Sequence, residues 1–365
     1  MFKMRHLFLP SLLFLTGCSS DQNILEKIGY IQSAAYDWAP DNKMKVTLSI
    51  PVIERESRDG YDEILTITAS SSKAAKNLLS RKTSRTLVSG QLRNLLYGIE
   101  LAKTGLRRNM DSILRDPSIS KRSNIILTEG EAHDIINRDY TGHPKTEQYV
   151  DKLLQKEFQL QNTPRILLHQ FVRDYFDEGI DPIATVIRIS GNDLEVSGIG
   201  LFKEDVYVTK LPTKDMIFFN LLYQNQKQGE FSFTLNDEDT KSIMFNAISS
   251  KRKIKIRRDE EGVLHADIQM VVHGSVLEYI GKLNLSTDDS AKVEKMMSAY
   301  ISEHSERVLS FMQKHGVDSI GLGRYVRNEL GYAQWKKLDW AEAYPSVQVH
   351  VHADFHIKNF GNFFD

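Results

Sequence analysis

The chain has 365 residues, of which 41% are hydrophobic and 26% are charged, the balance of a folded protein long enough for two or three domains. Its 47 basic and 48 acidic residues nearly cancel, which excludes the strongly basic composition typical of nucleic-acid-binding proteins. The single cysteine excludes a disulfide framework and any zinc or iron–sulfur site that needs several thiolates.

The first residues have the organisation of a signal peptide. Two cations and no acid lie within residues 1–6, and an apolar run at 7–15 follows that is too short to span a bilayer. The order Leu15-Thr16-Gly17-Cys18 then resembles the lipobox of bacterial lipoproteins. That resemblance implies cleavage before Cys18, with an S-diacylglycerol and an N-palmitoyl chain on this cysteine. The alternative is an ordinary secretory signal beside a small buried cysteine.

The first half of the mature chain combines short strands with helices. Apolar and alternating runs predict strands at 44–50, 63–68 and 124–127. Apolar residues at helical spacing predict a helix from 83 to just before Gly105, and further helices at 130–137, 149–160 and 166–176.

The composition shifts near residue 180 toward β-branched runs. These predict strands at 184–189, 194–202, 206–211, 231–235, 253–257, 264–272, 279–284 and 347–357, the second and third forming a hairpin. An apolar stripe predicts one long helix over 288–314.

The predicted fold class is α+β and multidomain, with mixed, mainly antiparallel sheets and flanking helices. The N-terminal half is expected to be rich in helices, and the C-terminal half rich in sheet with the one long helix. We expect a signal peptide at 1–17, a lipidated tether at 18–23, an N-terminal region of one or more domains at 24–182 and a C-terminal domain at 183–365. No stretch after the signal peptide is apolar enough to predict a membrane-spanning helix.

Two short motifs of penicillin-binding proteins occur in the first half. Ser70 and Lys73 have the S-x-x-K spacing, and Lys103-Thr104-Gly105 spells K-T-G. In those enzymes the serine opens a helix and the K-T-G lies on a strand, with a further serine motif between them. Here the K-T-G falls at the end of a predicted helix and the intervening motif is missing, so the sequence does not favour catalysis at this place.

Four polar residues alternate along the last predicted strand, where His350, His352, Asp354 and His356 point to one face. Imidazoles and a carboxylate have the chemistry of a zinc site. Because zinc ligands usually converge from different elements, and because the opposite face of this strand is apolar, a solvent-exposed sheet face without metal is favoured.

A basic strand runs from residue 251 to 258, with Ile254 and Ile256 facing inward and the charges outward. Such a strand can lie on anionic lipid. It can also be a solvated strand edge that its charge protects from aggregation. Three acidic residues follow at 259–261 and offset its field, so the sequence favours the solvated edge.

Several short motifs follow the lipobox in a fixed order. Residues 98–106 read GIELAKTGL, 114–117 read LRDP, 130–132 read GEA and 196–203 read VSGIGLFK, and Asp318, Gly321, Gly323, Trp335 and Trp340 precede the last predicted strand. Their order and spacing resemble the Ger(x)C family, the lipoprotein C subunits of spore germinant receptors in Bacillus-type bacteria.

The resemblance implies a non-enzymatic subunit without cofactor or metal. It would be lipid-anchored on the outer face of the cell membrane, the inner membrane of the spore, and would act with polytopic A and B subunits in nutrient-triggered germination. A lipid-anchored solute-binding protein of a transporter is the alternative, but that class needs two similar lobes, and the two halves predicted here differ. A cell-wall enzyme is the third possibility.

Aromatic residues crowd into the stretch from 321 to 344. Because a few aromatic side chains dominate most protein interfaces, Trp335 and Trp340 are the candidate contacts to partner subunits. The alternative is that both tryptophans pack in the core between the long helix and the last strand.

Overall fold

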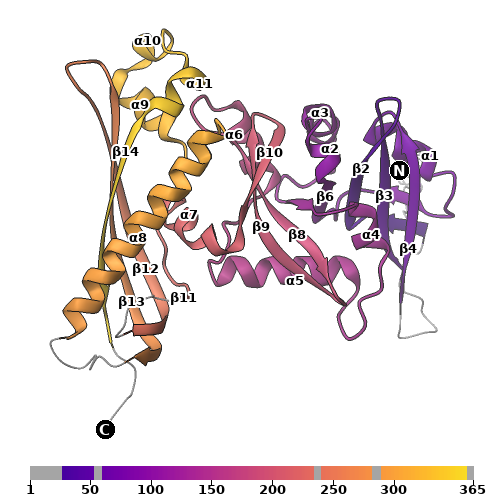
Figure 1. The fold of residues 1–365 in the computed structure, drawn as a ribbon. Coiled ribbons are helices and arrows are strands. Elements are labelled where there is room, and N and C mark those ends of the chain that lie inside the picture. The colour runs from indigo at the N-terminus through magenta and orange to yellow at the C-terminus, as the bar shows by residue number, and fades with distance from the viewer. Residues whose placement is uncertain (1–26, 53–59, 234–239, 282–288, 360–365) are drawn as a thin grey trace, which may run out of the picture.

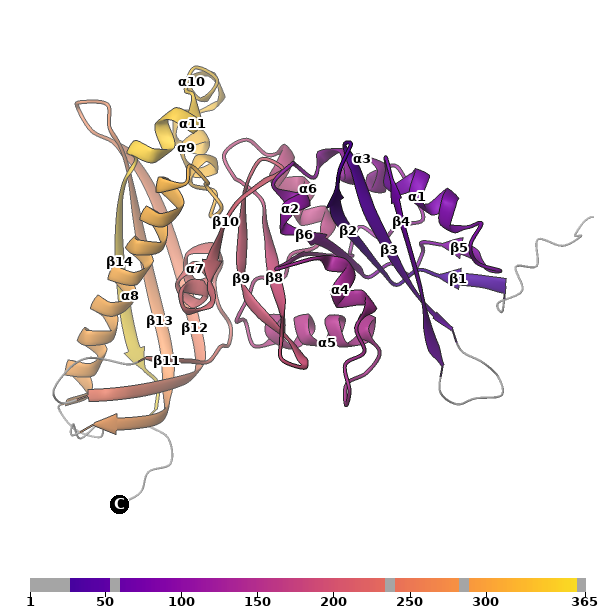
Figure 2. The same ribbon diagram turned by 45° about the vertical axis from the view of Figure 1, so that its right-hand side comes forward.

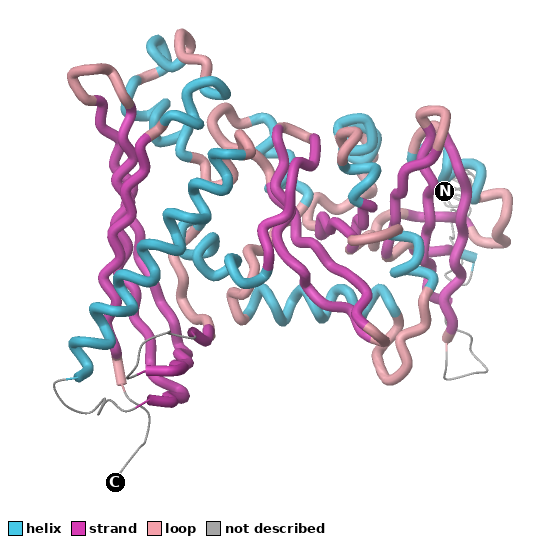
Figure 3. The backbone as a smooth tube through the Cα atoms, viewed as in Figure 1, coloured by secondary structure: helices cyan, strands magenta, loops and turns pink. Residues whose placement is uncertain are grey.

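The computed structural model describes residues 27–52, 60–233, 240–281 and 289–359. They form an elongated molecule with a β-sheet toward each end (Figures 1 and 2). The strands therefore gather in two groups, with helices around the first and one long helix across the second (Figure 3).

The larger sheet belongs to the N-terminal part and has the strand order β10-β9-β8-β7-β6-β2-β3-β4. Parallel ladders join β2, β6, β7 and β8, and antiparallel ladders form both flanks. The strands are β2 (Ser33–Ala39), β3 (Lys43–Val52), β4 (Tyr61–Ala69), β6 (Asn94–Gly98), β7 (Asn124–Thr128), β8 (Ile183–Ser190), β9 (Asp193–Lys203) and β10 (Val206–Pro212). A separate parallel pair joins β1 (Ile28–Tyr30) to β5 (Thr86–Val88).

Helices cover both faces of this sheet. On one face lie α1 (Ser72–Leu79), α2 (Ile99–Ala102), α3 (Arg107–Leu114) and α6 (Leu168–Phe176), and on the other lie α4 (Ala132–Asn137) and α5 (Thr146–Gln159). Every residue of β6 and β7 is buried as a result. Neighbouring residues of β6 enter separate cores, Leu95 the first and Leu96 the second.

The smaller sheet has the order β11-β12-β13-β14. Its strands are β11 (Phe231–Phe233), β12 (Thr240–Arg258), β13 (Leu264–Gly281) and β14 (Gln348–Ile357), and α8 (Asp289–Lys314) crosses one face. Between the two sheets lies α7 (Met216–Tyr223), preceded by the 3-10 turn η3 (Thr213–Asp215) (Figure 1). After α8 come α9 (Leu322–Leu330), α10 (Tyr332–Trp335), α11 (Trp340–Ala343) and η4 (Tyr344–Ser346).

One row of α8 side chains accepts hydrogen bonds from the backbone of β14, along the edge that does not pair with β13. The backbone N–H groups of residues 351, 353, 355 and 357 donate to Glu306, Ser302, Ser298 and Glu294, over 2.7–3.0 Å. Four residues of helix rise about 6.0 Å and two residues of strand about 6.6 Å, so the two spacings match. An edge that would otherwise present free N–H groups is thereby covered.

The predicted α+β class, with several layers and a 26-residue C-terminal helix, is confirmed. The hairpin of β9 and β10 and the closing strand are also confirmed. The helix predicted from residue 83 is wrong, since this segment forms β5, β6 and only the short α2. A short run of buried apolar residues fits a strand buried on both faces as well as a helix, and periodicity alone does not separate them.

The expected sheet-rich C-terminal half with one long helix is confirmed, and the N-terminal half has six described helices beside five of the eight strands of the larger sheet. The strands predicted at 264–272 and 279–284 are one strand as far as Gly281, and residues 282–284 lie outside the described residues. The division at 182/183 stays a prediction; β7 pairs with β8 across it, so the larger sheet runs past this position.

Candidate functional site

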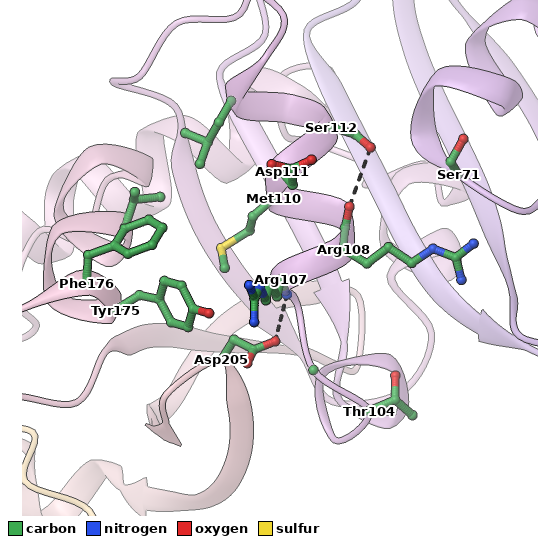
Figure 4. Close-up of a pocket in the computed structure, with 13 residues that line it drawn as sticks. Ser71, Thr104, Arg107, Arg108, Met110, Asp111, Ser112, Tyr175, Phe176 and Asp205 are labelled. Carbon is green, nitrogen blue, oxygen red and sulfur yellow. Dashed lines mark hydrogen bonds between the residues drawn. The ribbon is translucent and has the colours of Figure 1, made fainter.

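A groove of about 670 Å³ opens beside the N-terminal end of α3 (Figure 4). Asp205, in the turn between β9 and β10, forms its floor, and its carboxylate accepts a hydrogen bond of 2.7 Å from the backbone N–H of Arg107. A Cβ at Gly105 would lie 2.7 Å from the same carboxylate, and this glycine has φ +93°. The glycine of the GIELAKTGL motif therefore lets the chain turn closely against Asp205.

The wall of the groove combines charge with apolar surface. Arg107 and Arg108 are exposed on one side, and Phe176, at the end of α6, is 73% exposed on the other. Phe176 and Tyr175 also line a second cavity of about 580 Å³, between the N-terminal sheet and the α10–α11 segment. Phe176 thus lies between the groove and the second cavity. Its position at the end of an amphipathic helix gave no signal of this exposure in the sequence.

Residues within each of the two penicillin-binding-protein motifs lie at this groove, although the motif serine Ser70 does not. Ser71 and Thr104 both line it, but the Ser71 hydroxyl serves as the N-cap of α1 and accepts from Ala74 N over 3.1 Å. Lys103 forms an ion pair of 2.7 Å with Glu100. Ser70 and Lys73 are both exposed. Helix capping explains the position of Ser71, and an ion pair at the surface explains that of Lys103.

A buried carboxylate connects the segment before β8 to the segment after α8, at a contact between residues 177–181 and 318–340 that we call the joint. Asp318 is 1% exposed and accepts from the backbone N–H groups of Leu322 and Gly323 over 2.8 and 2.7 Å. Its own N–H donates to Asp181, whose carboxylate also accepts from Lys203 over 3.1 Å. Burial raises the pKa of Asp318 to about 7, and the nearby Asp181 charge adds to the rise.

Two glycines bring the backbones of this joint together. A Cβ on Gly179, which has φ +92°, would lie 2.5 Å from the carbonyl carbon of Gly323. A Cβ on Gly323 would lie 2.6 Å from the indole nitrogen of Trp340. Arg324 N donates to Gly179 O over 3.1 Å. The second glycine of the 321–323 motif therefore serves close packing.

The two candidate tryptophans bind within this joint. Trp335 is 4% exposed and its indole N–H donates to Glu178 over 2.7 Å, while Trp340 is half-buried and donates to Asp318 over 3.1 Å. Their ring centroids lie 5.8 Å apart. Trp335 packs inside the molecule, which favours the core alternative for this residue. Contact of either residue with a partner subunit stays a prediction.

The alternation predicted for the last strand is confirmed. His350, His352, Asp354 and His356 are exposed, and Val351 and Phe355 are buried. His265 from β13 lies beside His350, with ring nitrogens 3.4 Å apart. Within the described ranges no group of three or more histidine, cysteine and acidic side chains is placed to hold a metal ion.

The basic strand has the predicted facing for its lysines and isoleucines but not for Arg252, which is partly buried and donates from its guanidinium to the carbonyl oxygen of Tyr223 over 2.6 Å. Lys251, Lys253 and Lys255 are exposed, and Ile254 and Ile256 pack against the core. Cys18 lies outside the described residues, so its lipidation stays a prediction. Among the helices that the structure describes, none combines the length and apolarity needed to cross a membrane.

Comparison with known proteins gives consistent matches along the chain. Residues 21–189 match the model described as spore germination protein N-terminal domain, and residues 197–361 match spore germination B3/GerAC like, C-terminal. The chain is 26% identical over 357 residues to the spore germination protein GerQC of Bacillus cereus, covering 97% of this chain and 98% of that one. The crystal structure of the GerBC protein shares the fold, with a TM-score of 0.62 at 18% identity, over 92% of this chain and all of the other.

Proposed function

Because the chain belongs to the Ger(x)C family of spore germination proteins, we propose that it is the lipid-anchored, non-enzymatic C subunit of a spore germinant receptor. It acts with polytopic A and B subunits in nutrient-triggered germination. Its mature body stands on the outer face of the spore's inner membrane.

The observation that carries the membrane attachment is the order Leu15-Thr16-Gly17-Cys18 behind a short charged and apolar segment. Two or three acyl chains on one cysteine bind a bilayer far more strongly than a single chain, so this modification alone would keep the protein at the membrane. The non-enzymatic role is supported by the uses of the groove's polar residues, since Ser71 caps a helix and Asp205 holds a backbone turn.

The assignment is tested by Cys18→Ala in sporulating cells, with Ser19→Ala as the matched control. We expect Cys18→Ala to accumulate as an uncleaved precursor or to leave the membrane fraction, and its spores to germinate poorly with nutrients. Ser19→Ala should be processed and should germinate normally. A wild-type protein whose mature N-terminus is unmodified, or begins at another residue in mass spectrometry, would contradict the lipid anchor.

The partnership is tested separately. The wild-type chain solubilised from spore membranes should co-purify with two polytopic proteins. If it co-purifies instead with an ATPase cassette, the transporter-linked alternative replaces the receptor assignment.

A further inference from the structure

The smaller sheet has one face that no described helix covers. α8 packs on the face that carries Ile268, Val351 and Phe355. The strand register places the alternate residues on the opposite side, which we call the outer face. It comprises Lys251, Lys253, Lys255 and Arg257 of β12, His265, Asp267, Gln269, Val271 and His273 of β13, and Gln348, His350, His352, Asp354 and His356 of β14.

The fixed charge of this face is positive. Lys251, Lys253 and Lys255 are exposed, and none has an ion-pair partner among the described residues. Arg257 pairs with Asp267 over 2.7 Å, and that ion pair lowers the pKa of the aspartate. Three uncompensated lysines in alternate positions of one strand therefore lie in a row about 6.6 Å apart.

Histidines from two strands extend the row across the face. His265 stacks with His350 at a centroid distance of 5.7 Å, and His273 lies 5.3 Å from His356. Burial lowers the pKa of His273, and the charges of His356, Lys358 and Lys251 lower it further. Asp354 faces His352 over 3.3 Å, and Asp259, in the turn after β12, pairs with His265 over 2.9 Å. The described acids that face these histidines are therefore Asp259, Asp267 and Asp354. As the pH falls through the range in which histidine titrates, the positive charge of the face increases.

The shape of the face restricts what can cover it. The ladders of β13 with both neighbours keep an unbroken register from residue 265 to 273, so this surface is a continuous sheet face. The three lysines line neither the groove at α3 nor the second cavity beside Phe176. An extended cationic surface fits an extended anionic surface better than a small anion.

We propose that the outer face docks on an anionic phospholipid bilayer. This inference rests on the proposed function, which places the body at a membrane. β1 and the smaller sheet lie at opposite ends of the molecule (Figure 2), so the outer face would be a second membrane contact, separate from the N-terminal anchor. The lipid anchor supplies attachment, and the outer face sets orientation.

The test uses the mature chain from residue 18, made without its signal peptide so that no lipid is attached. Every described helix and strand begins at Ile28 or later, so this chain lacks none of them. Binding is measured by flotation with vesicles of phosphatidylcholine alone or with 30% phosphatidylglycerol, at low and high salt. This assay does not depend on Cys18, so its failure is distinct from failure of the anchor.

The decisive variant replaces Lys251, Lys253 and Lys255 by glutamine. Its control replaces Lys82, Lys121 and Lys152, which are exposed on the N-terminal part and change the net charge equally. Each lysine near an anionic surface contributes roughly a factor of five in affinity, so the outer-face variant should bind about a hundredfold more weakly. The control should bind like the wild type.

A second variant replaces His350, His352 and His356 by glutamine. Binding of the wild type should strengthen from pH 7.5 to pH 5.5, and this variant should lose most of that increase. The control lysine variant should keep it.

Several results would overturn the proposal. They are equal binding to neutral and anionic vesicles, insensitivity to salt, or equal weakening in both lysine variants. The lysines could instead only protect the β12 edge, in which case the outer-face variant aggregates. In that case the wild-type chain is compared with a variant that has arginine at 251, 253 and 255. The proposal requires both proteins to float with anionic vesicles and neither to float with neutral vesicles.

Discussion

The two sheets of this molecule differ in how many of their faces are covered by helices. The larger sheet has short central strands, covered on both faces by helices, and β6 and β7 are buried throughout. The smaller sheet has strands of up to 19 residues, with one face under α8 and the other open. Coverage, more than strand length, decides whether a strand alternates in polarity or reads as a continuous apolar run. The open face is consequently the one on which the sequence is free to place charge.

The difference in coverage between the two sheets is tested most directly by substituting neighbouring residues in one strand of each sheet. Leu95 and Leu96 are both 0% exposed, so either change to alanine should destabilise the fold by about 2–5 kcal/mol. In β13, Met270→Ala should cost a similar amount because Met270 is 1% exposed. Gln269→Ala, on the outer face, should stay within about 0.5 kcal/mol.

Urea unfolding of the mature chain measures these differences. Equal effects of the two β13 substitutions would contradict the assignment of an open face. A small effect of Leu96→Ala would contradict the second core, since Leu96 belongs to the cluster under α4 and α5.

The same contrast explains which elements could be predicted. The long helix was placed within one residue of its observed start, because its apolar stripe repeats over many turns. The last strand was predicted because its exposed and buried residues alternate. Apolar spacing predicts a helix where β6 lies and gives no signal for β2, because strands buried on both faces do not alternate.

The site was less predictable than the fold. Asp181 and Asp318 lie 137 residues apart, and no local pattern signals that they meet. The row of lysines was visible in the sequence, but the histidines of β13 join it only through the strand register. The tryptophans were identified by type, and their burial depends on Glu178 and Asp318, which come from other segments.

The second prediction concerns the joint between the two regions. Burial raises the pKa of Asp318 to about 7, above the value of about 3.9 expected in the unfolded chain. The folded state therefore holds this proton more tightly. Its contribution to stability is fully present below about pH 4 and is lost as the pH rises through about 7.

We expect the free energy of unfolding to fall between about pH 4 and pH 7, by up to about 1.4 kcal/mol per pH unit from this group, and the wild-type melting temperature to fall with it. The pKa values of Asp37, Asp174 and Glu147 are also raised by burial and act in the same direction. Asp318→Asn should flatten the dependence, and Glu147→Gln serves as the comparison from the N-terminal core. An unchanged slope in Asp318→Asn would show that the pKa of this carboxyl is the same in the folded and unfolded states.

The smallest expected effect concerns how the open sheet protects its edge. Ser302 of α8 accepts a hydrogen bond of 3.0 Å from Ala353 N, between equivalent bonds to Ser298 and Glu306. Ser302→Ala leaves this N–H without its acceptor and should cost about 1–3 kcal/mol, because a partly buried donor then lacks a partner. Ser310→Ala, exposed on the same helix, should change stability by less than about 0.5 kcal/mol. Hydrogen exchange at Ala353 reads the bond itself: its N–H should exchange faster in Ser302→Ala and at the wild-type rate in Ser310→Ala. Equal exchange in both variants would mean that packing of the β14 side chains under α8, and not the row of caps, protects this edge.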